Sequence, residues 1–438
     1  MKIVLVDPKG LTLGLNSGLG YMASSLKKKG HKVAVLDFNN KRGNEKKRLD
    51  IVKNADYVGI SIKSFTLNEA IKLARLVKKI NKKAVVLAGG PHITIDGYNF
   101  LKENECFDMA VIGEGEKILI EIIEKKNLKN IAGIIYRNGK EIKINQDKHW
   151  IKNLDTLPFP NYKCFDSVMD AYPLVTSRGC PYSCTYCSVR DVMGTLWRAR
   201  KPENIIEELK TAKEKYKINE FKVLDDNFTL DINRAKKLCE MLIANNINMK
   251  WSCPNGIRAD RLDNELLLLM KESGCYSISI GIESMHPEVF EKLEKGEKLT
   301  DVKNAIRMIK EKGMKIKGFF IIGLPGSTYE KDKFSLKESK KLGIEAAWGI
   351  LVPYPGTRIW LWLEKKIKLG NARILRDWKK GFHIGLLPKP VYETSSYKAK
   401  DMLKIYYMAN LRYLKLNNLL FIIKSMFRQR DEENDKLY

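Results

Sequence analysis

The stretch Cys180-Pro181-Tyr182-Ser183-Cys184-Thr185-Tyr186-Cys187 spaces three cysteines as C-x3-C-x2-C within eight residues. Three thiolates can bind one side of an iron–sulfur cluster, and they are one short of the four that fill a [4Fe–4S] cube. One iron then keeps an open site for a chelating ligand. A tetrahedral zinc site would need a fourth ligand, and folding would have to bring it from Cys164, Cys239, Cys253 or Cys275. The local spacing therefore favours the cluster over zinc.

Outward from these cysteines, apolar strands alternate with helical stretches, and polar or glycine-containing motifs follow the strands. The motifs are 225–229 (DDNFT), 251–260 (WSCPNGIRAD), 277–284 (SISIGIES), 318–326 (GFFIIGLPG) and 353–357 (PYPGT). Repeated strand–helix units with functional groups at the strand ends predict a partial (β/α) TIM-like barrel, whose site lies at the carboxyl ends of the strands.

The cysteine array and these motifs, taken in order to about residue 360, resemble the radical S-adenosylmethionine (SAM) superfamily. The resemblance implies that Cys180, Cys184 and Cys187 hold a [4Fe–4S] cluster, and that the amino and carboxylate groups of SAM chelate the open iron. Asp226 stands where the family has its motif for the amino group, although Gly-Gly-Glu itself is absent. The resemblance assigns SAM contacts to Tyr186, Asp226, Arg258, Glu283, Ser284 and Gly323.

The first 150 residues show a different repeat of short apolar runs and helical stretches. The predicted strands are 3–7, 33–37, 57–61, 84–90 and 109–113, with helices that include 20–29 and 67–80. This alternation predicts a parallel sheet in an α/β, Rossmann-like domain. Ligands of such sheets lie beyond the carboxyl ends of the strands. The residues predicted to form that ligand face are Pro8, Ser61, Gly89, Gly90, Gly113 and Glu114.

Pro158 and Pro160 break the periodicity, which predicts a linker between domains. We therefore expect a Rossmann-like domain over 1–148, a linker over 149–168, a radical SAM core over 169–366 and a helical, basic C-terminal part over 367–438.

An N-terminal domain of this type before such a core resembles the cobalamin-binding branch of the superfamily, and it implies that the predicted ligand face binds cobalamin. Many members of that branch use methylcobalamin to methylate unactivated carbon. The base-off fingerprint D-x-H-x-x-G is missing, because Asp147-Lys148-His149 continues to Lys152 where glycine is expected. Many members lack this histidine, and a degenerate domain without cobalamin stays an alternative.

Positive charge is concentrated near the C-terminus. The chain has 79 Lys and Arg against 52 Asp and Glu, a net charge of +27, and residues 358–430 contribute 17 basic and 4 acidic residues. Residues 398–428 are predicted to form one or two helices with basic and apolar faces. A helical lid on the barrel, an interfacial helix on an anionic membrane that delivers a lipid, and RNA binding all fit this pattern, and RNA binding fits it least.

The chain opens on a strand, and no run approaches the roughly 18 apolar residues that span a bilayer. We expect a cytoplasmic protein, with contact at the inner face of the membrane if the C-terminal part is interfacial. The eight cysteines are then thiols or metal ligands.

The function predicted from these resemblances is methylation of an unactivated carbon of a lipid or other small metabolite by a cobalamin-dependent radical SAM enzyme. An electron donor such as ferredoxin or flavodoxin is an implied partner, and no general acid or base is assigned. Alternatives are a radical SAM rearrangement, cyclisation or C–C or C–S bond formation, and a non-catalytic cluster-bearing regulator. The methylthiotransferases of transfer RNA are disfavoured because Cys106 is the only cysteine of the first 150 residues.

Overall fold

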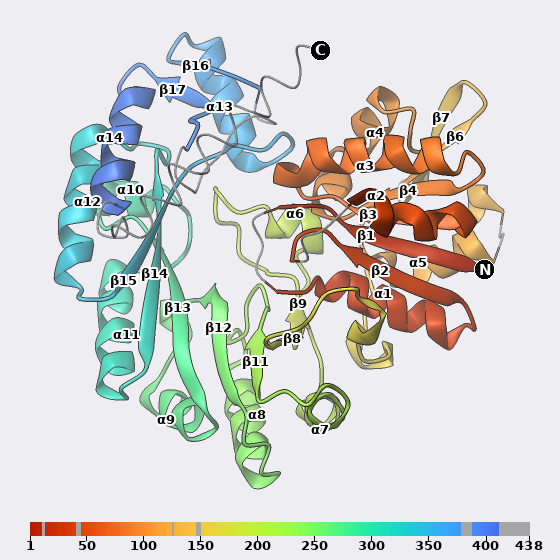
Figure 1. Cartoon of the computed structure of the whole chain (residues 1–438). Helices are drawn as coiled ribbons and strands as arrows, with labels where there is room; N and C mark the ends of the chain where they lie inside the picture. The colour runs from red at the N-terminus through yellow and green to blue at the C-terminus, as the bar shows by residue number, and fades with distance from the viewer. Residues whose placement is uncertain (11–13, 41–44, 125–126, 146–149, 378–387, 411–438) are drawn as a thin grey trace. The chain divides into compact units, whose positions relative to one another are not determined.

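The computed structural model describes the chain except for residues 11–13, 41–44, 125–126, 146–149, 378–387 and 411–438 (Figure 1). The chain divides into two compact units, each made of several segments. The first holds 1–280, 295–316 and 354–361, and the second holds 281–294, 317–353 and 362–438. The domain limits expected from the sequence remain predictions.

The N-terminal part of the first unit is a seven-stranded sheet in the order β2-β1-β3-β4-β5-β6-β7. Strands β1 to β5 are parallel, as predicted, whereas β6 and β7 extend the sheet antiparallel and were not predicted. The strands are β1 (Lys2–Asp7), β2 (Lys32–Asp37), β3 (Tyr57–Ser61), β4 (Val85–Gly89), β5 (Met109–Val111), β6 (Ile134–Asn138) and β7 (Glu141–Asn145).

Helices cover both faces of this sheet. Figure 1 shows α1 (Ser17–Lys28) and α5 (Gly115–Ile123) side by side on one face, and α3 (Leu67–Ile80) and α4 (Pro91–Glu103) on the other. The short helix α2 (Glu45–Arg48) follows β2. Helix α4 starts directly after β4 because Gly90, at φ 98°, turns the chain and Pro91 occupies the first helical turn.

From residue 150 on, the predicted linker packs against both the N-terminal domain and the start of the radical SAM core. Tyr162 is buried, and its hydroxyl donates to the Pro173 carbonyl at 2.9 Å. Asp166 accepts hydrogen bonds from the backbone N–H of Asp37 and from the Arg48 guanidinium, at 2.9 and 2.8 Å. The segment with Pro158 and Pro160 therefore separates the regular elements but is itself held in place by tertiary contacts.

The radical SAM part contains a six-stranded open sheet in the order β15-β14-β13-β12-β11-β8, and the division between the units passes through β13 and β14. The neighbouring pairs within each unit are parallel, which confirms the partial (β/α) barrel. Its strands are β8 (Tyr172–Leu174), β11 (Glu220–Val223), β12 (Lys250–Ile257), β13 (Cys275–Glu283), β14 (Lys315–Ile322) and β15 (Glu345–Ile350).

Helices follow the strands of this sheet in sequence. They are α7 (Pro202–Tyr216), α8 (Ile232–Ala244), α9 (Asn264–Glu272), α10 (Pro287–Glu291), α11 (Leu299–Glu311) and α12 (Tyr329–Lys341). A buried pair of stacked aromatic rings lies in the core of each unit, with Phe221 on Trp251 at 5.6 Å in the first and Phe320 on Trp348 at 4.5 Å in the second. Between β8 and α7 lie β9 (Ser177–Arg178), the cysteine loop, α6 (Val189–Met193) and β10 (Arg198–Ala199).

The C-terminal part contains α13 (Arg358–Lys368), an antiparallel pair β16 (Ala372–Ile374) and β17 (Tyr392–Thr394), and α14 (Ala399–Asn410). Helix α14 packs on α12 and β15 and buries Met402, Ile405 and Tyr406. The predicted helix over 398–428 is therefore present as far as residue 410, and the rest lies outside the described residues.

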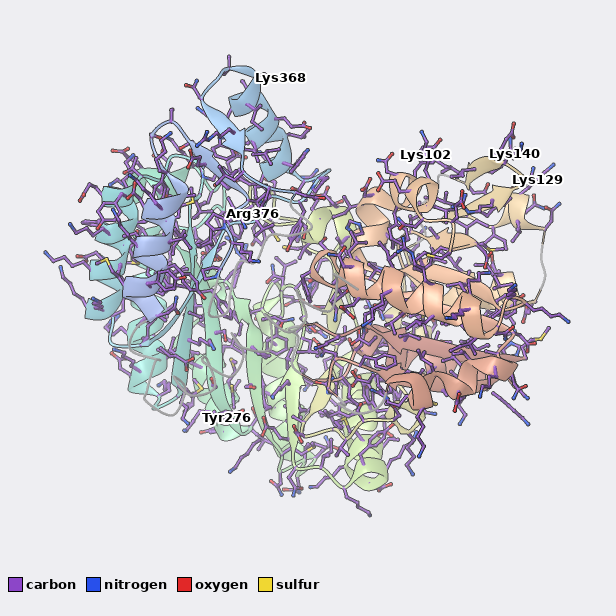
Figure 2. All side chains as sticks on the ribbon, turned by 45° about the horizontal axis from the view of Figure 1, so that its top comes forward. Lys102, Lys129, Lys140, Tyr276, Lys368 and Arg376 are labelled. Atoms are coloured by element: carbon purple, nitrogen blue, oxygen red, sulfur yellow. The ribbon has the colours of Figure 1, made fainter. Side chains whose placement is uncertain are left out.

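Among the described residues, no helix is both long enough and apolar enough to cross a bilayer. The lysines labelled in Figure 2 are exposed, so charge at these positions lies on the surface: Lys102, Lys129, Lys140 and Lys368.

Candidate functional site

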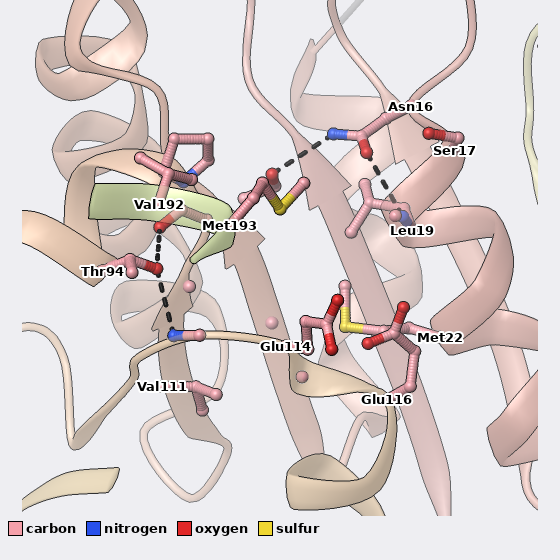
Figure 3. A pocket seen from close by; sticks show the side chains of 18 of the residues that line it. Asn16, Ser17, Leu19, Met22, Thr94, Val111, Glu114, Glu116, Val192 and Met193 are labelled. Atoms are coloured by element: carbon pink, nitrogen blue, oxygen red, sulfur yellow. Dashed lines mark hydrogen bonds between the residues drawn. The ribbon is translucent and has the colours of Figure 1, made fainter. Parts of the chain in front are cut away.

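A cavity of about 270 Å³ opens in the first unit at the carboxyl edge of the N-terminal sheet (Figure 3). The strand order reverses there, because β1 pairs with β2 on one side and β3 on the other. In open α/β sheets such a switch point is where ligands bind. The opposite wall comes from the radical SAM core: Val175, Ser177, Arg178, Val192, Met193, Leu224 and Asp226.

Five of the six residues predicted from the sequence for the ligand face line this cavity: Ser61, Gly89, Gly90, Gly113 and Glu114. The sixth, Pro8, is buried and does not belong to the lining. Thr94 links two of the loops, because its hydroxyl donates to the Gly90 carbonyl and accepts from the Gly113 N–H, both at 3.1 Å (Figure 3). The glycine backbone is thus held as part of the cavity wall.

Asn16, which sequence reasoning missed, connects three elements at the edge of the cavity. Its side-chain amide donates to Asp7 Oδ1 at 3.1 Å. The same amide donates to Ser61 Oγ at 3.2 Å, and its Oδ1 caps α1 by accepting from the Leu19 N–H (Figure 3). Burial raises the pKa of Asp7, and the Lys63 ammonium opposes that shift from 3.6 Å. The sequence signal for Asn16 was its place directly before the first helix, where Asn is a preferred N-cap residue.

Glu114 faces the cavity, but other side chains occupy its carboxylate. Arg178 Nη1 lies 3.0 Å from Oε1, Arg198 Nη1 lies 2.7 Å from Oε2, and the Ile151 N–H also donates to Oε2. Burial alone would raise the pKa of Glu114, yet these partners outweigh it and hold the pKa below its usual value. The second carboxylate at this wall, Glu116, accepts from Arg178 Nη2 at 2.7 Å.

The cysteine loop follows directly from this wall. Cys180, Cys184 and Cys187 are partly buried, and burial raises the pKa of all three thiols, that of Cys187 to about 12. In the described part of the chain no three Cys, His, Asp or Glu side chains converge as they would around a single ion. A four-iron cluster does not need that convergence, because each thiolate binds a different iron.

Two residues after β11 lie against the start of the loop. Asp226 Oδ2 accepts from the Gly179 N–H at 3.2 Å, and the Asn227 amide lies 3.8 Å from Cys180 Sγ. Burial raises the pKa of Asp226 to about 6. Asp226 therefore supports the cysteine loop, and its predicted contact with SAM remains a prediction.

Arg258 also supports the loop. Its guanidinium stacks on the Tyr182 ring at 3.6 Å, pairs with both Asp260 oxygens at 2.9 Å and donates to the Lys295 carbonyl at 2.6 Å. Arg261 Nε donates to the Tyr182 hydroxyl at 3.1 Å. These contacts hold the residue between the first two cysteines, while the expected contact between Arg258 and the SAM carboxylate stays untested.

The remaining predicted SAM residues are divided between the units. Tyr186 is half-buried in the loop of the first unit. In the second unit Glu283 is buried with φ at 65°, Ser284 Oγ lies 3.0 Å from Ser335 Oγ, and the Gly323 N–H donates to Asp332 at 3.0 Å. Their predicted roles remain predictions.

Two family models match the chain: the B12 binding domain over residues 9–123 and the radical SAM superfamily over residues 174–335. An uncharacterized methyltransferase of Pyrococcus horikoshii is 32% identical over 435 residues, which cover 94% of this chain and 93% of that protein. The chain belongs to the cobalamin-dependent radical SAM methyltransferase family.

Two further proteins are similar to the chain. The cytidylyl-2-hydroxyethylphosphonate methyltransferase of Streptomyces wedmorensis is 28% identical over 400 residues, covering 75% of this chain and 74% of that protein. The solved structure of the radical SAM methyltransferase TsrM from Kitasatospora setae superimposes with a TM-score of 0.75 at 16% identity, covering 92% of this chain and 90% of that one. The second likeness shows the same fold.

The cofactors of this radical SAM family are a [4Fe–4S] cluster, SAM and cobalamin, and the residues present fit the first and the last. The partly buried thiols with raised pKa need a compensating positive charge to ionise, and iron supplies it. The cavity at the switch point is lined by backbone at Gly89, Gly90 and Gly113, so a large ligand can approach closely.

No histidine is among the described residues that line the cavity. The rejected candidate, 147–149, lies outside the described residues. Cobalamin held in this cavity therefore receives no imidazole from its described lining. Arg178 and Lys63, which the sequence analysis did not select, supply the cationic side chains of that lining.

Proposed function

We propose that this enzyme transfers a methyl group to an unactivated carbon of a lipid or other small metabolite. The observation that carries the proposal is the shared cavity, because one wall is the B12-binding sheet and the other is the segment that starts the cysteine loop. When bound, cobalamin supplies the methyl group, and the cluster with SAM supplies the radical that activates carbon.

The chain's own residues hold and shield this chemistry. Apolar side chains make up much of the cavity wall and limit access of water to whatever is bound there: Leu5, Leu19, Met22, Val175, Val192 and Met193. Arg258 and Arg261 hold Tyr182 and so fix the loop that carries the cysteines. Ser177 Oγ donates to Asp225 at 2.6 Å and fixes the same segment from the core side.

A small acidic electron donor such as ferredoxin or flavodoxin is the proposed protein partner, because the net charge of +27 attracts an acidic surface.

Contact with an anionic membrane through the C-terminal part is the proposed route for a lipid substrate. Liposome flotation of the full chain, with and without anionic lipid, tests that contact directly. If the protein stays in the lipid-free fraction with both kinds of liposome, membrane contact is refuted.

The test of the reaction uses the full chain, loaded anaerobically with iron, sulfide and cobalamin, and SAM that carries a trideuterated methyl group. Lipid and polar extracts are supplied separately as substrates, with chemical reduction. We expect 5′-deoxyadenosine, S-adenosylhomocysteine and a product heavier by the labelled methyl group. Cys184→Ala should abolish 5′-deoxyadenosine formation, whereas Cys164→Ala, outside the loop, should not.

The other outcomes separate the alternatives. Formation of 5′-deoxyadenosine without any labelled product in either extract would refute methyl transfer and favour a rearrangement or cyclisation. Absence of both SAM products from cluster-loaded protein would favour a non-catalytic regulator. A labelled product in the polar extract alone would restrict the substrate to a metabolite that is not a lipid.

A further inference from the structure

A buried group of four charges joins the B12-binding sheet to the entrance of the cysteine loop. Glu114 and Glu116, after β5, face Arg178 on β9 and Arg198 on β10. The charged atoms are 2.7 to 3.0 Å apart, and the side chains are only 3% to 7% exposed. We call Glu114, Glu116, Arg178 and Arg198 the charge bridge.

Arg178 is the central member of the charge bridge. Its two terminal nitrogens reach different carboxylates, Nη1 to Glu114 and Nη2 to Glu116, and its guanidinium lies 5.1 Å from the Tyr21 ring of α1. A planar fork can satisfy two carboxylates at once in a way that a lysine ammonium cannot. Removing one partner in a buried site leaves an uncompensated charge, so the bridge holds together as a unit.

The charge bridge also belongs to the cavity wall. Arg178, Glu114 and Glu116 are all lining residues, and Figure 3 shows both carboxylates beside Met22. A large ligand in the cavity thus lies against the bridge. Displacement of either carboxylate would move Arg178, because the guanidinium spans both of them.

Only Gly179 separates Arg178 from the first cysteine, Cys180, in the chain. Gly179 has φ at 85°, and the Cβ of any other residue there would clash with the Leu196 carbonyl oxygen. Its N–H is held by Asp226, which lines the same cavity. The backbone between Arg178 and Cys180 therefore has little freedom, and the position of Arg178 constrains that of Cys180.

We propose that the charge bridge couples the two cofactor sites, so that cobalamin in the cavity and the cluster on the cysteine loop each strengthen binding of the other. Arg178 is the positioning residue of this coupling. Substitution of its partner Glu116 therefore tests the coupling. The inference goes beyond the proposed function, because it concerns cofactor loading and holds whatever the substrate is. Such coupling is reciprocal by thermodynamic necessity.

The test measures the dissociation constant of hydroxocobalamin for the full chain by its visible spectrum, with and without the reconstituted cluster. We expect the cluster to tighten cobalamin binding by about 5- to 150-fold, the usual range of coupling between two sites. Glu116→Gln removes one carboxylate charge and should bring this ratio close to one. Arg178→Lys keeps the charge but lacks the planar fork whose separate nitrogens reach Glu114 and Glu116, and it should do the same.

The matched control is Asp166→Asn. Asp166 also pairs with an arginine that joins the linker to the N-terminal domain, Arg48, at 2.7 Å, but it does not line the cavity. This variant should keep the wild-type ratio. A wild-type ratio of one, an unchanged ratio in both charge-bridge variants, or an equal loss in Asp166→Asn would overturn the proposal.

Cluster retention provides the reverse measurement, which needs no methyl transfer. Iron that survives a fixed chelator challenge should increase when cobalamin is present in wild-type protein. In Glu116→Gln and Arg178→Lys it should not depend on cobalamin. Protection by cobalamin that is as large in both variants as in the wild type would contradict the charge bridge as the connection.

Discussion

Gly90 offers a sharp test of the cavity wall, because a methyl group at this position has no room. Its backbone has φ 98° and ψ −177°, a region that is essentially restricted to glycine. A Cβ there would lie 2.9 Å from both the N and the O of Ile62. The neighbour cannot move freely, because the Ile62 N–H donates to the Gly89 carbonyl and the Ile62 carbonyl accepts from the His92 N–H.

The cost of Gly90→Ala follows from these two features. Backbone strain of this kind costs about 1 to 3 kcal/mol, and weakening one of the Ile62 hydrogen bonds adds about 1 kcal/mol. We therefore expect Gly90→Ala to lower the free energy of unfolding by about 2 to 4 kcal/mol. Gly89→Ala is the matched control, since its Cβ would meet nothing within 4 Å and the neighbouring backbone is an ordinary strand.

Urea denaturation of cofactor-free protein, followed by circular dichroism, measures both variants against wild type. Hydrogen exchange in β3, β4 and the start of α4 should rise in Gly90→Ala before global unfolding. Gly89→Ala should stay within about 0.5 kcal/mol of wild type, as ordinary surface changes do. Equal stability of the two variants would refute the argument from backbone conformation.

Three further changes have direct readouts. Cys184→Ala should remove the visible absorbance of the cluster together with SAM cleavage, and retained cleavage would disprove the ligand assignment. Tyr182→Ala should lower iron retention under chelator challenge because the stacking on Arg258 is worth about 0.5 to 2 kcal/mol, whereas Tyr182→Phe keeps the ring and should retain the iron; equal losses would contradict the role of stacking. Burial raises the pKa of Asp332 to about 6, so its carboxyl favours folding below about pH 4 and that contribution is lost as the pH rises through 6. The stability of wild type relative to Asp332→Asn, measured by urea denaturation of cofactor-free protein, should accordingly decrease between pH 4 and 7, and a constant difference would contradict this assignment.

Local sequence patterns predicted the regular elements where the physical cause is local. The strand at Tyr57–Ser61 and the helix at Leu67–Ile80 have the predicted limits, because a buried apolar run and a 3.6-residue period define them. The hairpin of β6 and β7 escaped prediction. The sequence nevertheless carries its signals, namely the apolar run Ile134-Ile135-Tyr136, the Asn138-Gly139 turn and the alternation of Ile142 and Ile144 with polar residues, so this hairpin was predictable from local pattern.

In the candidate site, some residues can be found from local sequence pattern and others only from the tertiary structure. Cys180, Cys184 and Cys187 are found from spacing alone, and the glycines of the cavity from their places after strands. The contacts of Arg178 could not be found that way, because Glu116 lies 62 positions earlier in the chain and no local pattern pairs them. Glu114 was selected because it follows a strand, and only the tertiary structure reveals that two arginines occupy its carboxylate.

Because the linker packs on the N-terminal domain, that domain cannot be isolated or exchanged cleanly at residue 148. A fragment that ends at residue 148 would lose Tyr162 and Pro160, which lie so close to Gly20 that a Cβ there would be 2.7 and 3.0 Å from them, and would expose the part of α1 that they cover. It would also strip Asp37 of the Ser167 hydroxyl, which donates to it at 2.6 Å. The B12-binding module thus depends on sequence that follows it, and exchange of modules between relatives should succeed only when the linker travels with its N-terminal partner.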